Sequence, residues 1–205
     1  MWYITGLPLA SLLCGFLERD SSHIGQGLIS RPIWIGAVLG ACCRQLETGL
    51  WLGALFELLY MDALPIGVAV PSNGTVAAAV GTLCALSSAA IHPSLAFLYG
   101  WGWGRIHQIL DVRMRMDASK FNSMLESVPP EYLSRKMTGL IIRWNFRYAI
   151  LTAAFIYAAS LLGSFLLKGL WAELVPVVRR SMEVWFQLLP FVMLSGALHL
   201  LKWNR

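Results

Sequence analysis

Charged side chains are scarce in this sequence. Only 13% of its 205 residues are charged, whereas 57% are hydrophobic, and the mean hydropathy is +0.62. A soluble globular domain has about 25% charged residues, because charge keeps its surface hydrated. Residues 63–104 contain no Asp, Glu, Lys or Arg, and neither do residues 1–17, 148–167 and 184–201. Since a helix needs about 20 apolar residues to cross a bilayer, the sequence predicts an integral membrane protein.

Signatures of catalysis and of metal binding are missing as well. The sequence has no G-x-S-x-G, H-E-x-x-H, P-loop or G-x-G-x-x-G motif. None of the four histidines stands at metal-ligand spacing from a cysteine, and the cysteines form no C-x-x-C pair. All four cysteines lie in apolar runs, which is typical of small buried side chains: Cys14, Cys42, Cys43 and Cys84. We therefore expect no metal, no cofactor and no enzymatic activity in this chain.

The basic residues are concentrated between Arg105 and Arg147. Eight of the 16 Lys and Arg residues lie in this stretch, together with only four acids. Because basic loops stay on the cytoplasmic side of a membrane, we expect residues 105–137 to form a cytoplasmic loop with some helix. This loop would separate an N-terminal membrane part, residues 1–104, from a C-terminal one, residues 138–205. The basic residues alternate with acids and flank apolar spans, so they do not predict nucleic-acid binding.

Two of the hydrophobic runs are too short to cross a bilayer. A polar connection, residues 18–23, follows the first span, and then residues 32–43 and 48–56 are apolar on either side of a polar step. A re-entrant hairpin, two half-helices and an interrupted pair of spans all agree with this pattern. Irregular backbone at membrane depth survives only beside protein or a water-filled cavity, and short interrupted segments mark transporter binding sites. We predict an all-α membrane fold of about six spans, with broken or re-entrant helices forming a transport domain.

Glycines recur at G-x-x-x-G spacing in both short runs. Gly36 and Gly40 form one such pair, and Gly49 and Gly53 form the other. This spacing lets two helices approach closely. We expect it to serve packing within the chain rather than dimerisation.

Glu57 is an ionisable residue inside an apolar segment. It lies between residues 48–56 and 58–61. A charge at membrane depth costs about 2.5–3.5 kcal/mol, so such a residue indicates a functional site; the alternative is a solvated carboxylate at the interface near Asp62. Segments nearby in sequence supply further polar groups, namely Gln26, Ser30, Arg31, Ser72 and Asn73. Amides, hydroxyls and a carboxylate suit a sugar, whose hydroxyls both donate and accept hydrogen bonds.

Three motifs follow one another between residues 25 and 73. They are GQGLISRP at residues 25–32, Gly40 followed by ETGL at 47–50 and GALFELL at 53–59, and LPIGVAVPSN at 64–73. In this order and at this spacing they resemble the IIC subunit of mannose/sorbose-family phosphotransferase permeases. Beyond residue 90 only the general plan is similar, with a polar segment followed by late spans.

The resemblance implies group translocation. In this family a IIC subunit, paired with a IID membrane subunit, binds a hexose and carries it across the bacterial inner membrane, where IIB phosphorylates it with phosphate received from IIA. Trimers of IIC–IID pairs embedded in membrane lipid are the family's assembly. By matching positions, Gln26, Arg31, Glu57 and Asn73 lie at or beside the sugar site. Glu57 would accept hydrogen bonds from sugar hydroxyls, Asn73 would donate or accept them, and Arg31 would brace either the carboxylate or the broken backbone.

Two departures from the family pattern leave a second interpretation open. Asn73 stands where the family has Asp, and Ser72 replaces the preceding Pro. The negative charge of that Asp is therefore missing, which would change the choice of substrate or weaken transport. The sequence is also short for the family. The alternative is a degenerate, non-transporting scaffold or regulatory subunit whose basic segment, residues 105–136, docks a soluble partner.

Overall fold

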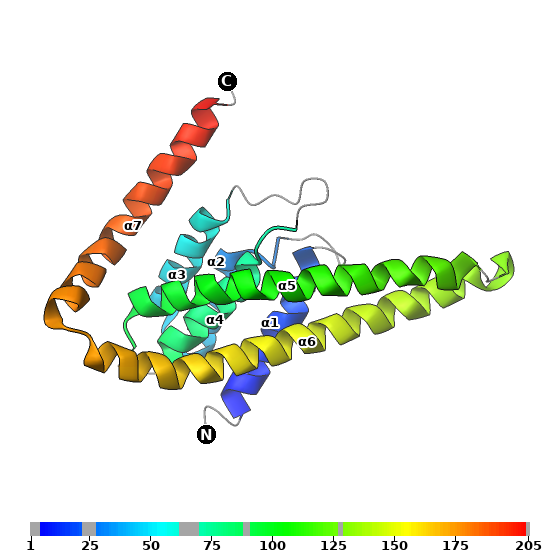
Figure 1. Cartoon of the computed structure of the whole chain (residues 1–205), viewed down its shortest axis with the longest axis horizontal. Helices are drawn as coiled ribbons and strands as arrows, with labels where there is room; N and C mark the ends of the chain where they lie inside the picture. The colour runs from blue at the N-terminus through cyan, green and yellow to red at the C-terminus, as the bar shows by residue number, and fades with distance from the viewer. Residues whose placement is uncertain (1–4, 22–27, 62–69, 88–90, 127–128, 204–205) are drawn as a thin grey trace.

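Helices form every regular element in the part of the chain that the computed structural model describes, which is residues 5–21, 28–61, 70–87, 91–126 and 129–203 (Figure 1). In chain order the elements are α1 (Leu7–Leu17), the short 3₁₀ helix η2 (Glu18–Ser21), α2 (Pro32–Cys42), α3 (Leu46–Leu59), α4 (Gly74–Ser87), α5 (Pro93–Glu126), α6 (Pro130–Glu173) and α7 (Pro176–Trp203). The predicted all-α fold class is confirmed for these residues.

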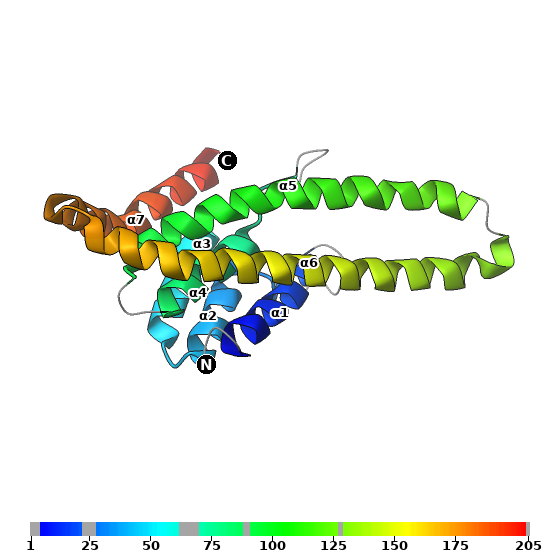
Figure 2. The ribbon, with the colours of Figure 1, turned by 60° about the horizontal axis from the view of Figure 1, so that its bottom comes forward.

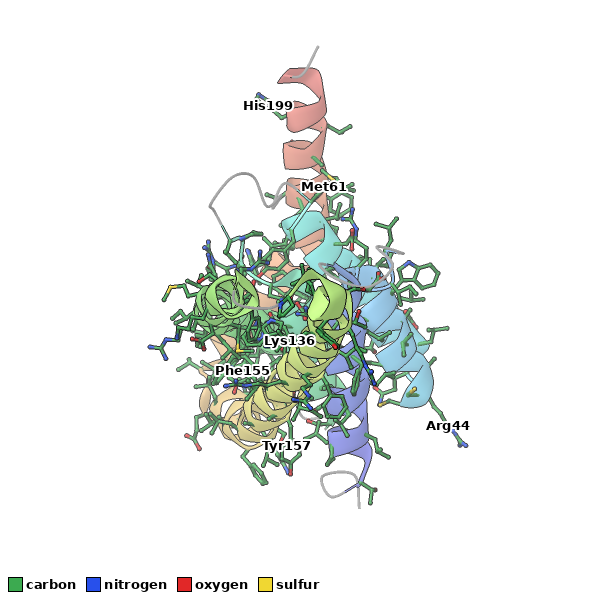
Figure 3. All side chains as sticks on the ribbon, turned by 90° about the vertical axis from the view of Figure 1, so that its right-hand side faces the viewer. Arg44, Met61, Lys136, Phe155, Tyr157 and His199 are labelled. Carbon is green, nitrogen blue, oxygen red and sulfur yellow. The ribbon has the colours of Figure 1, made fainter. Side chains whose placement is uncertain are left out.

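The two short hydrophobic runs form an antiparallel helical hairpin, α2 and α3. Pro32 opens α2, where a proline ring suits the first helical position. Arg44 turns the chain between the helices with a positive φ of 57°, and its side chain points away from the body in Figure 3. Helices of 11 and 14 residues are about 16 and 21 Å long, shorter than a bilayer core of about 30 Å. Among the arrangements that the sequence left open the structure has a hairpin of short helices, whose depth in the membrane stays a prediction.

The G-x-x-x-G glycines join the two helices of this hairpin. A Cβ atom on Gly36 would lie 2.8 Å from the Cα of Gly53, and one on Gly49 would lie 2.7 Å from the Cα of Gly40. Real Cβ atoms do not come this close to backbone, so only glycine allows this helix spacing. The expected packing within the chain is therefore confirmed.

Gly49→Leu is expected to destabilise the protein by about 1–3 kcal/mol, because the added side chain forces α2 and α3 apart. Gly139→Leu is the matched control, since nothing lies within 4 Å of a Cβ at Gly139. The midpoint of unfolding, measured while SDS is titrated into the detergent-solubilised protein, compares the two variants. Equal midpoints would show that the close approach of the hairpin helices contributes nothing.

Helix α4 forms the centre of the bundle. Its residues from Thr75 to Leu86 are all buried, and it packs against α2, α3, α5 and α6. A helix that is covered on every side needs small side chains, which Ala77, Ala78 and Ala79 provide. The other helices therefore take their places around α4, and its first residues lie close to several of them.

The α5 and α6 helices extend far beyond this bundle as a paired hairpin (Figures 1 and 2). The structure has more helix here than the predicted loop with some helix at residues 105–137, because α5 continues to Glu126 and α6 begins at Pro130. Lys, Arg, Met and Leu are good helix formers even where no core covers them, and ring contacts such as Phe121–Trp144, 5.1 Å between centroids, join the two helices. The cytoplasmic position of this segment stays a prediction.

By length and composition, two helical stretches of the described residues could cross a membrane. They are Tyr132–Glu173 and Pro176–His199, and the second forms the arm α7 that leaves the bundle at the end opposite the hairpin tip (Figure 1). The apolar helices α2 and α4 are shorter. The count of about six spans therefore stays a prediction.

Candidate functional site

Glu57 and Arg31 form an ion pair where the end of α3 meets the start of α2. The Nη1 of Arg31 lies 2.9 Å from Oε1 of Glu57, and the backbone N–H of Ile33 donates to Oε2 at 3.4 Å. The carboxylate thus also faces the N-terminus of α2, where the helix dipole favours a negative charge. Both side chains are partly exposed, Glu57 at 25% and Arg31 at 46%. A half-exposed pair adds little to stability, so its carboxylate oxygens can exchange partners when a ligand arrives.

Asn73 caps the central helix and binds a second carboxylate. Its Oδ1 accepts a hydrogen bond from the backbone N–H of Val76 at 3.0 Å, the geometry of a helix N-cap. Its Nδ2 donates to Oε1 of Glu18 at 2.9 Å. An aspartate could form the cap but could not donate to Glu18. The Asn that departs from the family pattern therefore matches the acceptor that this chain places beside it.

Asn73→Asp is accordingly expected to destabilise the protein by about 1–3 kcal/mol, because a donor to a buried carboxylate becomes a second carboxylate. Asn73→Ser is the control, since serine also caps helices well and introduces no charge. SDS-induced unfolding midpoints should fall further for Asp than for Ser. The opposite order would show that Glu18 does not need the amide donor.

The segments that carry these residues meet at one junction. The hydroxyl of Thr75 donates to the backbone carbonyl of Ser30 at 2.6 Å, which ties the start of α4 to the residues before α2. A Cβ on Gly74 would lie 3.0 Å from the Tyr60 ring and 3.3 Å from the ring of Pro32. The start of α4 is thus in contact with the start of α2 and with the end of α3, the two helix ends that lie near Glu57.

Of the four predicted site residues, the structure brings Arg31 and Glu57 into direct contact. It places Asn73 at the same junction, but the Asn73 side chain bonds to Glu18 and not to Glu57. Gln26 lies outside the described residues. The structure thus places three of the four residues at one junction, and their part in a sugar site stays a prediction.

Glu18 and Arg19, which open the expected polar connection at residues 18–23, are buried in the structure; residues 22 and 23 lie outside the described residues. Only 3% of the Glu18 surface and 2% of the Arg19 surface is exposed. The guanidinium of Arg19 donates to Oδ1 of Asn145 from Nη2 at 2.7 Å and from Nε at 3.1 Å, and it lies 4.1 Å from the centroid of the Tyr148 ring. Buried charges need such partners. These partners come from α6, and Asn145 lies 126 residues after Arg19 in the sequence.

A continuous polar layer leads from this pair to the base of the long hairpin. The hydroxyl of Tyr148 donates to Oδ1 of Asp111 at 2.8 Å, and Asp111 pairs with Arg115 at 3.2 Å. Glu18 and Arg19 directly follow the apolar run of residues 1–17, and that placement is the signal by which they could have been identified from the sequence. Asp111 lies within the polar stretch 105–137 and carries no such signal. The layer connects Asn73 to α5 and α6, so a change at the junction has a physical route to the hairpin.

The described residues contain no group of three or more His, Cys, Asp or Glu side chains that could hold a metal ion. The junction instead offers a carboxylate, a guanidinium and a carboxamide. Such a set can hold a neutral polyhydroxylated molecule by hydrogen bonds, since it combines acceptors with donors.

A family model described as "PTS system sorbose-specific iic component" matches residues 5–201. A curated relative from Escherichia coli (strain K12), named "Putative N-acetylgalactosamine permease IIC component 2", is 32% identical over 84 residues. That alignment covers 41% of this chain and 62% of the relative, so it spans less than two thirds of the relative's length.

Two solved structures share the fold. One, titled "Structure of membrane protein", superposes with a TM-score of 0.71 at 14% identity and covers 96% of this chain and 80% of that one. The other is a cryo-electron microscopy structure of the mannose transporter ManYZ with microcin E492, with a TM-score of 0.58 at 13% identity, covering 98% of this chain and 79% of that one. At these identities the likeness concerns the fold alone.

Proposed function

The chain belongs to the family of PTS sorbose-specific IIC components, and from that premise we propose that it is the membrane subunit that binds a hexose and carries it across the bacterial inner membrane for phosphorylation. The observation that supports this most directly is the junction of α2, α3 and α4, where the half-exposed pair of Glu57 and Arg31 lies beside the capping amide of Asn73.

The chemistry of this junction suits a sugar. A carboxylate accepts hydrogen bonds from two neighbouring hydroxyls at once, and charged acceptors form the stronger bonds. Arg31 holds the carboxylate in place in the absence of substrate and can donate to ring or hydroxyl oxygens when substrate is bound. A site of this kind discriminates between sugars, because a substrate that lacks one hydroxyl leaves a buried polar group without a partner. The curated relative is named for N-acetylgalactosamine, so acetylated hexosamines are the first class to test.

We assign the remaining steps of group translocation to partner subunits. A IID subunit would complete the membrane assembly as a trimer of IIC–IID pairs, and a soluble IIB subunit would phosphorylate the sugar on the cytoplasmic side. The α5–α6 hairpin is the element best suited to meet IIB. It projects from the bundle and exposes basic side chains, including Arg113, Arg135, Lys136 and Arg143.

Equilibrium binding tests the proposal. The full chain, purified together with its IID partner, is incubated with radiolabelled mannose, glucose, fructose, sorbose, N-acetylglucosamine and N-acetylgalactosamine. Saturable binding of one hexose, displaced by the same unlabelled sugar, is the expected result. If a folded complex binds none of them, the chain is instead the scaffold or regulatory subunit, and the hairpin's docking of a soluble protein becomes its function.

A further inference from the structure

A cavity with basic side chains and a largely apolar wall lies at the opposite end of the molecule from the hairpin tip. It is formed where the start of α5, the end of α6 and the start of α7 meet, at the corner visible in Figure 1. Its volume of about 830 Å³ falls within the range of about 300–1,000 Å³ that is usual for small-molecule sites. Three of its lining side chains carry basic nitrogens, namely His92, Lys168 and Arg179, and none of the lining residues is acidic.

The two permanent cations of this cavity are available to a ligand. Among the described residues Lys168 has no ion-pair partner, and the Nε of Arg179 is buried without a hydrogen bond. Arg179 is held in place, because its Nη2 donates to the backbone carbonyl of Ala172 and its guanidinium lies 5.9 Å from the Trp171 ring centroid. The nearby acid Glu183 does not line the cavity and pairs with Arg180 at 3.3 Å.

His92 adds an oriented donor. Its ring stacks on Trp171, with centroids 4.7 Å apart and an angle of 10° between the planes. Nδ1 lies 2.7 Å from the hydroxyl oxygen of Ser94, and the backbone N–H of Ser94 donates to Nδ1 at 3.3 Å. With Nδ1 as the acceptor of the backbone N–H, the neutral ring carries its proton on Nε2. Within the described residues Nε2 makes no hydrogen bond. Three donor groups from three segments thus line one cavity.

The position of the cavity along α6 indicates which anion meets it. Residues 148–167 are free of charge, and 20 helical residues are about 30 Å long, the thickness of a bilayer core. Arg147 precedes this stretch and Lys168 follows it. Lys168 and Trp171 therefore lie at the level of the lipid headgroups, where tryptophan is enriched. The anion that is abundant at this level is the phosphate of a phospholipid.

We propose that this cavity binds one anionic phospholipid. Its phosphate is held by Lys168, Arg179 and the Nε2 of His92, and its glycerol and upper acyl chains lie along the apolar wall that includes Ile91 and Pro93. An anionic lipid is preferred over a zwitterionic one, because the cavity supplies positive charge and has no acidic side chain to receive a choline or ethanolamine cation. A bound lipid at this corner would join α5, α6 and α7.

Native mass spectrometry of the full chain in a mild detergent tests the proposal. Dioleoylphosphatidylglycerol should bind as a single adduct, at least about tenfold more tightly than dioleoylphosphatidylcholine. Arg179→Gln should weaken phosphatidylglycerol binding about tenfold, since it removes a charge-assisted hydrogen bond to the phosphate. Arg180→Gln is the matched control, because the neighbouring arginine does not line the cavity, and its effect should stay within about twofold. Equal binding of both lipids, or equal effects of the two substitutions, would overturn the proposal.

A variant that leaves every charge in place provides an independent test. Gly169 lines the cavity and has nothing within 4 Å of its Cβ position, so Gly169→Phe should fill the space and abolish the adduct without disturbing the helix. Gly196→Phe, at a helical glycine with the same open surroundings, should bind as the wild type does. Retention of phosphatidylglycerol by Gly169→Phe would refute the site. Binding of inorganic phosphate or glycerol 3-phosphate to delipidated protein, as tight as that of the lipid and lost in Arg179→Gln, would replace the lipid with a soluble phosphate ligand.

Discussion

Glu57→Gln is expected to abolish sugar uptake and to leave the protein folded in the membrane. The substitution keeps the size of the side chain and removes its charge, so it breaks the 2.9 Å ion pair with Arg31 and converts one acceptor oxygen to a donor. Hydrogen bonds to a charged group are worth about 1.5–3 kcal/mol each, and 1.4 kcal/mol is a factor of ten in affinity. With two sugar hydroxyls on the carboxylate, we expect hexose affinity to fall at least about 100-fold.

Uptake of the radiolabelled sugar by cells that produce the complex measures this effect, and binding to the purified complex separates affinity from transport. Glu47→Gln is the matched control, because Glu47 lies in the first turn of the same helix α3 and makes no ion pair among the described residues. It should transport normally. Normal uptake in the Glu57 variant, at equal amounts of protein in the membrane, would show that the sugar binds elsewhere.

Arg19→Leu is expected to destabilise the protein by about 3–5 kcal/mol, the largest stability change that we predict. It removes the guanidinium whose Nη1 lies 3.9 Å from Oε2 of Glu18, and so leaves a buried carboxylate with less compensation. Arg19 is 2% exposed, and its loss also removes two hydrogen bonds to Asn145 and the contact with the Tyr148 ring. The free energy of unfolding in SDS, with circular dichroism as the signal, measures the change. Arg143→Leu, at an exposed position of α6, should cost less than about 0.5 kcal/mol.

A second substitution distinguishes charge from packing. If the cost arises from the carboxylate of Glu18, then Glu18→Gln in the Arg19→Leu background should recover part of the lost stability, because a neutral amide is cheaper to bury than a charge. The coupling between the two positions, obtained from the four proteins of a double-mutant cycle, should be at least about 0.5 kcal/mol. Additive effects would mean that Arg19 stabilises the protein through Asn145 and Tyr148 alone.

The short helices were predictable because the signals that define them are local. Pro32 at the start of α2, the polar step after residue 43 and the break before Gly74 are each properties of a few adjacent residues. The glycine spacing likewise predicted a close helix pair, since side chains four apart on a helix share one face. The hydrophobic pattern did not set the depth of these helices in the membrane, because that depends on what surrounds them.

The long hairpin shows where local signals fail. Residues 105–137 are polar, and their composition predicted a loop with some helix rather than two long helices. In the structure α5 and α6 support each other along their length through contacts such as Phe121–Trp144 and Tyr148–Asp111. Most helical stability in proteins arises from such packing rather than from propensity, so the hairpin could be recognised only once its two helices had been paired.

The candidate site, too, was predictable from the sequence only in part. Glu57 could be identified because a carboxylate within an apolar run is conspicuous in the sequence, and Arg31 and Asn73 followed from the motifs that resemble the family. The bond from Asn73 to Glu18 could not be predicted, because these residues are 55 positions apart and belong to different motifs. Gln26 stays a prediction.

By itself, the sequence determined that this protein is a membrane protein built from helices, that two of its hydrophobic helices are short, and that it belongs among the IIC components. These properties depend on composition, on the length of hydrophobic runs and on short motifs, all of which can be read from residues that are adjacent in the sequence. Only the tertiary structure decided that Glu18 and Arg19 are buried, that a polar layer joins Asn73 to α5 and α6, and that His92, Lys168 and Arg179 line one cavity. Such contacts join residues that lie far apart along the chain, and a single sequence holds no periodic trace of them.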